Sequence, residues 1–80
     1  MKVLKIHDRD NVAVAIQAID QGQTVAAGST LLTVAQTIDK GHKVALTAIG
    51  QGENIIKYGF PIGQATFSIA PGEWVHTHNI

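Results

Sequence analysis

The segment Ile19-Asp20-Gln21-Gly22-Gln23-Thr24-Val25 carries the pattern that decides the fold. An isoleucine is followed by a glycine three positions later, and by a β-branched residue three positions after the glycine. The pattern returns in residues 38–44, 49–55 and 69–75. Glycine allows the positive φ of a tight turn, and the β-branched residue favours a new strand. We therefore predict four corners, with Ile19, Ile38, Ile49 and Ile69 buried and Gly22, Gly41, Gly52 and Gly72 in turns.

Between the corners, the apolar residues alternate with the period of a β-strand. Leu4 and Ile6 alternate with Lys5 and His7, and Val12, Val14 and Ile16 alternate with Ala13 and Ala15. The alanines favour a helix over residues 13–18, but the alternating β-branched residues favour a strand. Single helical turns fit residues 18–20 and 37–39. The corners are 19, 11 and 20 residues apart, too irregular for a solenoid. The prediction is a compact, pseudo-symmetric all-β domain with short helical turns.

Length and composition define one small domain spanning residues 1–80. The chain has 80 residues, of which 45% are hydrophobic and only 5% aromatic, so aliphatic side chains must form its core. Charged residues make up 15%, against about a quarter in typical domains. We infer from this sparse charge that a partner or a neighbouring domain covers part of the surface.

Charge and hydropathy argue against several classes of function. Six Lys and Arg residues balance six Asp and Glu residues, so no net field attracts nucleic acid or an anionic membrane. There is no cysteine for a disulfide, and no apolar run approaches the roughly 20 residues of a membrane span. The first residues are too interrupted by charge for a signal peptide, which leads us to expect a cytoplasmic protein.

Two predicted turns carry side chains that could take part in chemistry. In Gly41-His42-Lys43, the imidazole can act as acid, base or ligand, and the ammonium group can bind a carboxylate or phosphate. In Lys57-Tyr58-Gly59, the lysine and tyrosine could bind the carboxylate and hydroxyls of a sugar acid. Each motif also has a plainer interpretation. The first fits a solvated turn, and the second fits a capped hairpin in which Tyr58 packs over the edge of the core.

The last residues contain two histidines, at positions 76 and 78. On an extended strand, both rings would leave the same face as Trp74, spaced so that they could share a metal ion. Two imidazoles do not complete a site, so His42, His7 or another chain would supply the remaining ligands. A shared site requires the His42 ring to lie within ~10 Å of His76 or His78. The plainer interpretation is a frayed terminus.

No nucleophile motif, phosphate-binding loop or dinucleotide-binding fingerprint is present. The polar segment His7-Asp8-Arg9-Asp10-Asn11 fits turn capping, so we assign it a structural role first. An enzyme of 80 residues would also struggle to enclose a substrate. Any catalysis therefore needs a second component.

Three stretches resemble a known family: KIHDRDNVAVA from Lys5, GHKVALTAIGQGENIIKYGFPIGQA from Gly41 and GEWVHTHN from Gly72. They are similar to the N-terminal domain of altronate dehydratases (altronate hydrolases), which belongs to the SAF group and has a β-clip fold. The resemblance covers nearly the whole chain and is weakest between Gln17 and Asp39. The motifs GHKVAL and IIKYGFPIG, in that order, are specific to sugar-acid dehydratases and their small subunits. Galactarate dehydratase and sulfolactate sulfo-lyase are similar but more distant.

The resemblance implies a hydro-lyase that converts D-altronate to 2-dehydro-3-deoxy-D-gluconate, usually with Fe²⁺. It implies that the polar motifs face a site shared with a large catalytic region. On this basis we assign a catalytic role to His42 and the metal side of the site to His76 and His78. Substrate contacts are assigned to Lys43, Lys57, Tyr58 and Asn79.

The family's full-length form includes a large catalytic region that these residues lack. We expect the chain to be a small subunit or a domain of a longer enzyme, inactive alone. The resemblance does not fix the sugar acid, the metal or the number of copies that assemble. The alternatives are a non-catalytic carbohydrate-acid binding or assembly module, and a part of a galactarate dehydratase or sulfolactate sulfo-lyase.

Overall fold

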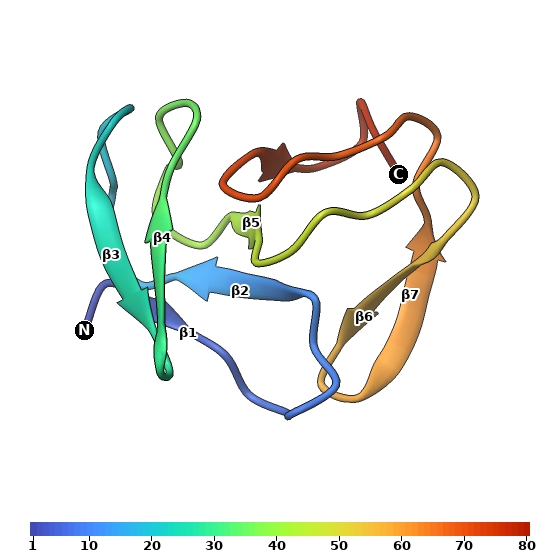
Figure 1. Ribbon diagram of the computed structural model, residues 1–80, viewed down its shortest axis with the longest axis horizontal. Helices are drawn as coiled ribbons and strands as arrows, with labels where there is room; N and C mark the ends of the chain where they lie inside the picture. Colours follow the sequence, from blue (N-terminus) through green and yellow to red (C-terminus); the bar gives the residue numbers. More distant parts are fainter.

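The computed structural model describes residues 1–80 and contains only strands, turns and bends. The strands are β1 (Val3–Leu4), β2 (Val12–Ala15), β3 (Thr24–Ala27), β4 (Thr30–Thr33), β5 (Lys43–Ala45), β6 (Asn54–Lys57), β7 (Phe60–Gln64) and β8 (Trp74–Val75). All pairings are antiparallel. A four-stranded sheet has the order β1-β2-β5-β8, and the β3–β4 and β6–β7 hairpins stand on either side of it (Figure 1). The all-β prediction is confirmed, and no helix long and apolar enough to cross a membrane is present.

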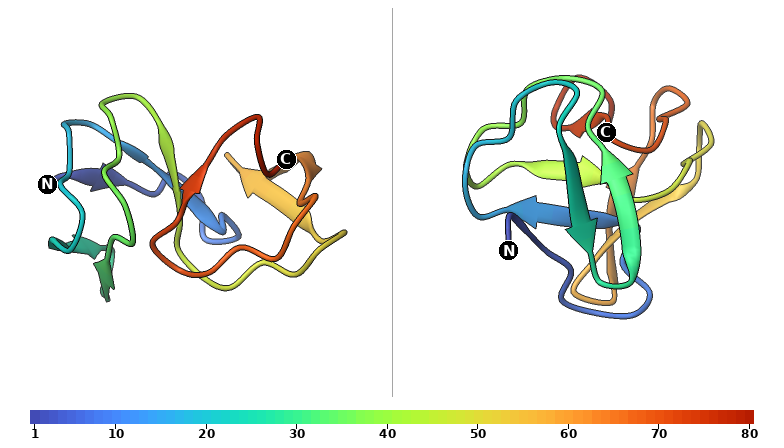
Figure 2. Two further views of the ribbon diagram at one scale, coloured as in Figure 1. Left: turned by 90° about the horizontal axis from the view of Figure 1, so that it is seen from above. Right: turned by 60° about the vertical axis from the view of Figure 1, so that its left-hand side comes forward.

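The central sheet buries an apolar core on each of its faces. Side chains alternate along β2 and β5, so Ala13 and Val44 point to one face while Val12 and Ala45 point to the other. The first core includes Val25, Ala27 and Leu32 of the β3–β4 hairpin, and the second includes Ile55 of β6. Figure 2 shows the two hairpins as separate arms on opposite sides of the sheet. The middle strands are therefore covered on both faces.

The four predicted corners are confirmed. Ile19 pairs with Ile38 and Ile49 pairs with Ile69 in isolated antiparallel bridges, and all four side chains are at most 2% exposed. The glycine of each corner lies in a turn with φ between 85° and 88°. The helical turns expected at residues 18–20 and 37–39 are absent. There the isoleucine backbones pair with each other, and this extended pairing replaces the local helical bonds.

The two halves of the chain repeat the same backbone hydrogen bonds. The bonds Gly22 N–Val34 O and Gly41 N–Ala15 O in the first half recur as Gly52 N–Ala65 O and Gly72 N–Ala45 O in the second. The sequence repeats with this geometry, because Val14-Ala15-Ile16-Gln17-Ala18-Ile19 corresponds to Val44-Ala45-Leu46-Thr47-Ala48-Ile49. The predicted pseudo-symmetry therefore relates the two halves, so that the first corner is equivalent to the third and the second corner is equivalent to the fourth.

The alternation of residues along the first two strands does not identify the buried side chains. On β1 the buried residue is Val3, while Leu4 and Ile6 are exposed. On β2, Ala13 and Ala15 are buried and Ile16 beyond the strand is exposed. The alternation of large and small side chains does not separate inside from outside here, because both faces of β2 are covered.

Candidate functional site

Three histidines gather around the indole of Trp74, and we call His42, Trp74, His76 and His78 the imidazole–indole cluster. Strand β8 pairs with β5, so the corner that leads into β5 lies beside β8. The indole Nε1–H of Trp74 donates a hydrogen bond to Nδ1 of His42 at 3.0 Å. The ring centroids of His42 and His76 are 5.1 Å apart. The expected proximity of His42 to the last histidines is therefore confirmed.

The two later histidines each pack on the indole of Trp74. The His76 ring stacks on it with centroids 5.2 Å apart and planes 10° apart. The His78 ring lies 4.8 Å away at 38°. The extended strand expected here is wrong, because β8 ends at Val75 and a turn closed by the Asn79 N–His76 O hydrogen bond follows. The turn, rather than strand alternation, brings both rings to Trp74.

Asn79 shapes this turn. Its side chain is 4% exposed, its Oδ1 accepts from the backbone N–H of His76, and its Nδ2 donates to the carbonyl of Trp74. Both polar atoms of the amide of Asn79, a residue predicted to contact substrate, are hydrogen-bonded within the turn. These two bonds stabilise the turn that carries His76 and His78.

The imidazoles do not form a metal site by themselves. No group of three or more His, Cys, Asp or Glu side chains is arranged to hold an ion. Nδ1 of His42 is occupied by the indole N–H, and the rings of His76 and His78 contact Trp74 rather than each other. Two imidazole ligands of one ion would converge on it at ~2 Å. The donor set of this chain therefore does not complete the expected Fe²⁺ site.

The lysine side of the predicted site lies on the other face of the central sheet. Lys43 is directly opposite Val14 and Val75, whereas Trp74 is directly opposite Val44. Directly opposite residues share a face and successive residues alternate. The predicted site residues therefore do not gather on one face of this sheet. They divide into the imidazole–indole cluster and a second group, Lys43, Lys57 and Tyr58, which we call the lysine–tyrosine group.

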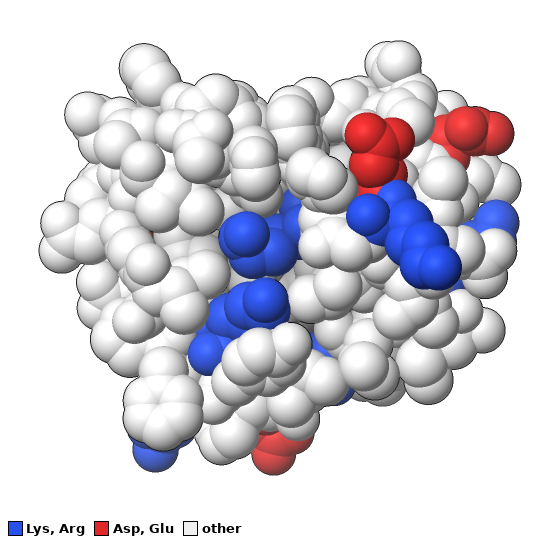
Figure 3. Space-filling model, turned by 180° about the vertical axis from the view of Figure 1, so that it is seen from behind, with Lys and Arg blue, Asp and Glu red and all other residues white.

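The lysine–tyrosine group concentrates positive charge. Burial lowers the pKa of Lys43, and the neighbouring charge of Lys57 lowers this pKa further. The ammonium of Lys57 also lies 4.8 Å from the ring centroid of Tyr58, a cation–π contact. Figure 3 shows a group of Lys and Arg side chains near the middle of the rear face, and a further basic side chain beside an acidic one at its upper right. Two neighbouring ammonium groups suit an anion such as a carboxylate.

Asp10 is a buried acid whose tertiary role was missed by sequence analysis. Only 5% of it is exposed, and its carboxylate accepts hydrogen bonds from the backbone N–H groups of His7 and Gly59. Burial alone would raise its pKa, but the backbone hydrogen bonds, led by that from Gly59, outweigh burial and lower it. The segment 7–11 is a capped turn, as predicted. In addition, Oδ1 of Asp10 accepts a hydrogen bond from Gly59 in the distant β6–β7 turn. The density of polar residues was the only local signal.

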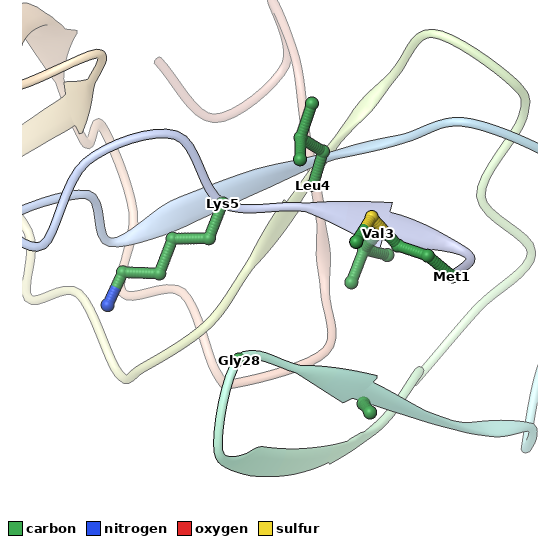
Figure 4. Close-up of a pocket in the computed structure, with 6 residues that line it drawn as sticks. Met1, Val3, Leu4, Lys5 and Gly28 are labelled. Atoms are coloured by element: carbon green, nitrogen blue, oxygen red, sulfur yellow. The ribbon is translucent and has the colours of Figure 1, made fainter.

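The one pocket of the molecule lies away from both groups. It has a volume of about 270 Å³ and opens between β1 and the β3–β4 hairpin (Figure 4). Its lining is mainly apolar and consists of Met1, Val3, Leu4, Lys5, Ala26 and Gly28. None of the predicted site residues lines it. The candidate residues therefore form surface sites rather than an enclosed substrate cavity.

Fold and site together define a small all-β module that presents two polar groups on its surface. The chain belongs to the altronate/galactarate dehydratase SAF domain family, whose model matches residues 1–80. The recognition made from the three sequence stretches is confirmed.

Three relatives illustrate the similarity, and two of them are much longer than this chain. Altronate dehydratase of Escherichia coli (strain K12) is 48% identical over 79 residues, which are 99% of this chain and 16% of that protein. Altronate dehydratase of Bacillus subtilis (strain 168) is 43% identical over 95% of this chain and 15% of that protein. The (2R)-sulfolactate sulfo-lyase subunit alpha of Chromohalobacter salexigens is 34% identical, over 94% of this chain and 88% of that subunit. The chain thus spans about a sixth of the dehydratases but most of a separate subunit.

Proposed function

We propose that this chain is the accessory, substrate-side module of a hydro-lyase that dehydrates D-altronate to 2-dehydro-3-deoxy-D-gluconate. The observation that carries the proposal is the imidazole–indole cluster, in a chain whose whole length matches the dehydratase family. The large relatives support a catalytic region beyond these residues, either fused or separate. The module contributes surface groups to a site that this region completes.

Dehydration of a sugar acid removes the proton beside the carboxylate and expels the β-hydroxyl. Because Nδ1 of His42 accepts the Trp74 N–H, the neutral imidazole carries its proton on Nε2. We assign His42 the role of hydrogen-bond donor to the departing hydroxyl rather than that of a base. His76, held by stacking on Trp74, is the neighbouring group for proton exchange.

Two further assignments follow from the division of the site. We assign the substrate carboxylate to Lys43 and Lys57, because their adjacent charges favour an anion. This requires the catalytic region to reach both faces of the central sheet. We assign the family's Fe²⁺ to the catalytic region, since the donor set here is incomplete. Its chemistry, when bound, is stabilisation of the developing negative charge on the carboxylate side.

The experiment compares the chain alone with the chain plus its catalytic region and Fe²⁺. The chain alone should show no D-altronate dehydration, and the assembled enzyme should turn over. His42→Ala and His76→Ala should each lower kcat by ~10²-fold or more in the assembled enzyme. Thr77→Ala, an exposed change within the same turn, is the matched control and should retain activity. Turnover by the chain alone, or full activity of both histidine variants, would show that the proposal is wrong.

A non-catalytic binding module is the second candidate, favoured by the relative that is a separate small subunit. In that case the chain alone should bind D-altronate, and its binding should depend on Lys43 and Lys57 but not on the histidines. Calorimetric titration of the wild type, Lys57→Met and His42→Ala separates the two functions.

A further inference from the structure

The structure contains two like charges that must be held together. Lys43 and Lys57 come from different strands, β5 and β6, and the charge of Lys57 adds to the burial that lowers the pKa of Lys43. Like charges near a partly buried site repel, so an unrestrained Lys57 would move away into solvent. Lys57 is the last residue of β6, directly before the β6–β7 turn. Its position therefore depends on how firmly that turn is fixed.

The β6–β7 turn is held in a conformation that its sequence does not favour. Tyr58 has φ 57° and is the only non-glycine residue with positive φ, and Gly59 follows at φ 79°. Such two-residue turns usually contain Asn-Gly or Gly-Gly, because a side chain like tyrosine is strained there. The equivalent β3–β4 turn has Gly28 at the first position, with φ 62°, and no strained residue. The strain is thus confined to the hairpin that carries the lysine.

Asp10 fixes the strained turn from outside the hairpin. Its Oδ1 accepts the N–H of Gly59 at 2.8 Å, and its Oδ2 accepts the N–H of His7 at 3.0 Å. The neighbouring Asn11 accepts a hydrogen bond from the backbone N–H of Ile56, near the end of β6, at 2.7 Å. Added bulk at Gly59 would meet the His7 ring at 3.0 Å, so the segment also packs closely on the turn. No side-chain hydrogen bond of this kind reaches the β3–β4 turn.

We propose that Asp10 is a positioning residue: by bonding the Tyr58–Gly59 turn, it holds Lys57 beside Lys43 and keeps the pair ready for a carboxylate. The choice of a sugar-acid carboxylate as ligand rests on the proposed function. The positioning itself does not, because it concerns only the geometry of this chain. The strained turn at Tyr58 then places the ammonium of Lys57 over the tyrosine ring.

The test is the titration of Lys43 followed by NMR of its side chain in the 80-residue chain, wild type against Asp10→Asn. If the turn relaxes and Lys57 moves away, the pKa of Lys43 rises toward its usual value of 10.5. Loss of a carboxylate charge by itself would act in the opposite direction, because a nearby negative charge raises a lysine pKa. The sign of the change therefore separates positioning from simple electrostatics. Asp8→Asn, an exposed acid in the same segment, is the matched control and should produce no rise.

A folded Asp10→Asn variant with an unchanged or lowered Lys43 pKa would overturn the proposal. Should this variant not fold, Asp10→Ser keeps an acceptor for the local His7 amide, is too short to reach the Gly59 amide, and is judged by the same criterion. D-altronate titrated onto the Lys43 and Lys57 signals forms a second arm, in which Asp10→Asn should weaken binding about tenfold. Absence of binding to the wild type would refute the carboxylate assignment alone and leave the Lys43 titration to decide the positioning role.

Discussion

The β3–β4 and β6–β7 hairpins occupy equivalent places in the two halves of the molecule, yet only one is braced from outside. They share the corner bridges and the backbone bonds that attach each hairpin to the sheet. The β3–β4 hairpin turns at Gly28-Ser29 without a side-chain brace. The β6–β7 hairpin turns at Tyr58-Gly59 and is bonded by Asp10 and Asn11. The same backbone arrangement therefore carries no candidate site residue in the β3–β4 hairpin, whereas it carries Lys57 and Tyr58 in the β6–β7 hairpin.

The corners teach the same lesson. His42 follows the glycine of the second corner, and Glu73 follows that of the equivalent fourth corner. Glu73 bonds the N–H of Ala70 within its own corner, whereas His42 receives the indole N–H of Trp74. Repetition supplies the scaffold, and single substitutions at equivalent positions supply the chemistry. The predictions below test how far the two halves are equivalent.

The largest expected effect is on the shared core. Ile19→Ala and Ile49→Ala should each lower the free energy of unfolding by ~2–5 kcal/mol, because each removes a fully buried side chain. If the halves are equivalent in packing, the two losses should agree within about 1 kcal/mol. Urea denaturation measures both. If only one variant is destabilised, the two halves share the same backbone geometry but do not contribute equally to stability.

The second comparison concerns two equivalent glycines with nearly the same φ, 85° at Gly41 and 87° at Gly72. Gly41→Ala should cost ~1–2 kcal/mol, since its added methyl group meets no atom and only the backbone is strained. Gly72→Ala should cost at least ~1–3 kcal/mol more, because the methyl group meets the carbonyl oxygen of Thr33. Thermal unfolding of the two variants is the measurement. If both variants lose the same stability, the close packing of Gly72 against Thr33 does not contribute to the cost of the substitution.

The third prediction concerns the external brace and its pH dependence. At neutral pH, Asp10→Asn should cost ~1–3 kcal/mol, because it breaks hydrogen bonds to a buried charge. The folded-state pKa of Asp10 lies below its usual value of 3.8, so its contribution is complete above pH 3.8 and is lost as the pH falls through the lowered pKa. Wild type and variant should therefore converge in acid. Unfolding measured from pH 7 to pH 2, with Asp8→Asn as control, checks the sign.

The smallest expected effect is a gain. Lys43→Met should raise the free energy of unfolding at neutral pH by about 0.5 kcal/mol, because it removes a partly buried charge next to another. Since the folded state lowers the pKa of Lys43, the unfolded chain holds its proton longer, and wild-type stability should rise with pH until about 10.5. The variant should lack this rise. A destabilised Lys43→Met variant would show that the packing of the lysine side chain stabilises the fold by more than its charge destabilises it.

The corners could be predicted from sequence because their signal is local. Ile19 and Gly22 lie three positions apart, and both the buried anchor and the positive φ follow from residue type. The inward faces could not be predicted, because Ala13 and Ala15 become interior only when a hairpin covers them. Val3 rather than Leu4 is buried because Val3 pairs with Ala15, and this pairing is a tertiary contact that the local sequence does not reveal.

The candidate site was predicted in its members but not in its arrangement. That His42 lies near His76 follows from the pairing of β5 with β8. The separation of Lys43 from the histidines also had a signal, because neighbouring residues at the start of a strand point to opposite faces. The only local signal for the role of Asp10 was the density of polar residues around it, and the role of Asn79 in its turn had no local signal. Their buried polar atoms have partners that depend on the finished fold.

The indole at the centre of the imidazole–indole cluster is the only tryptophan of the chain. Its ultraviolet emission therefore reports from one place, without any label. Because the rings of His76 and His78 both pack on Trp74, a change in their packing, such as contact with a catalytic region would cause, should alter this emission. The molecule carries its own optical probe at the surface where its partner is proposed to bind.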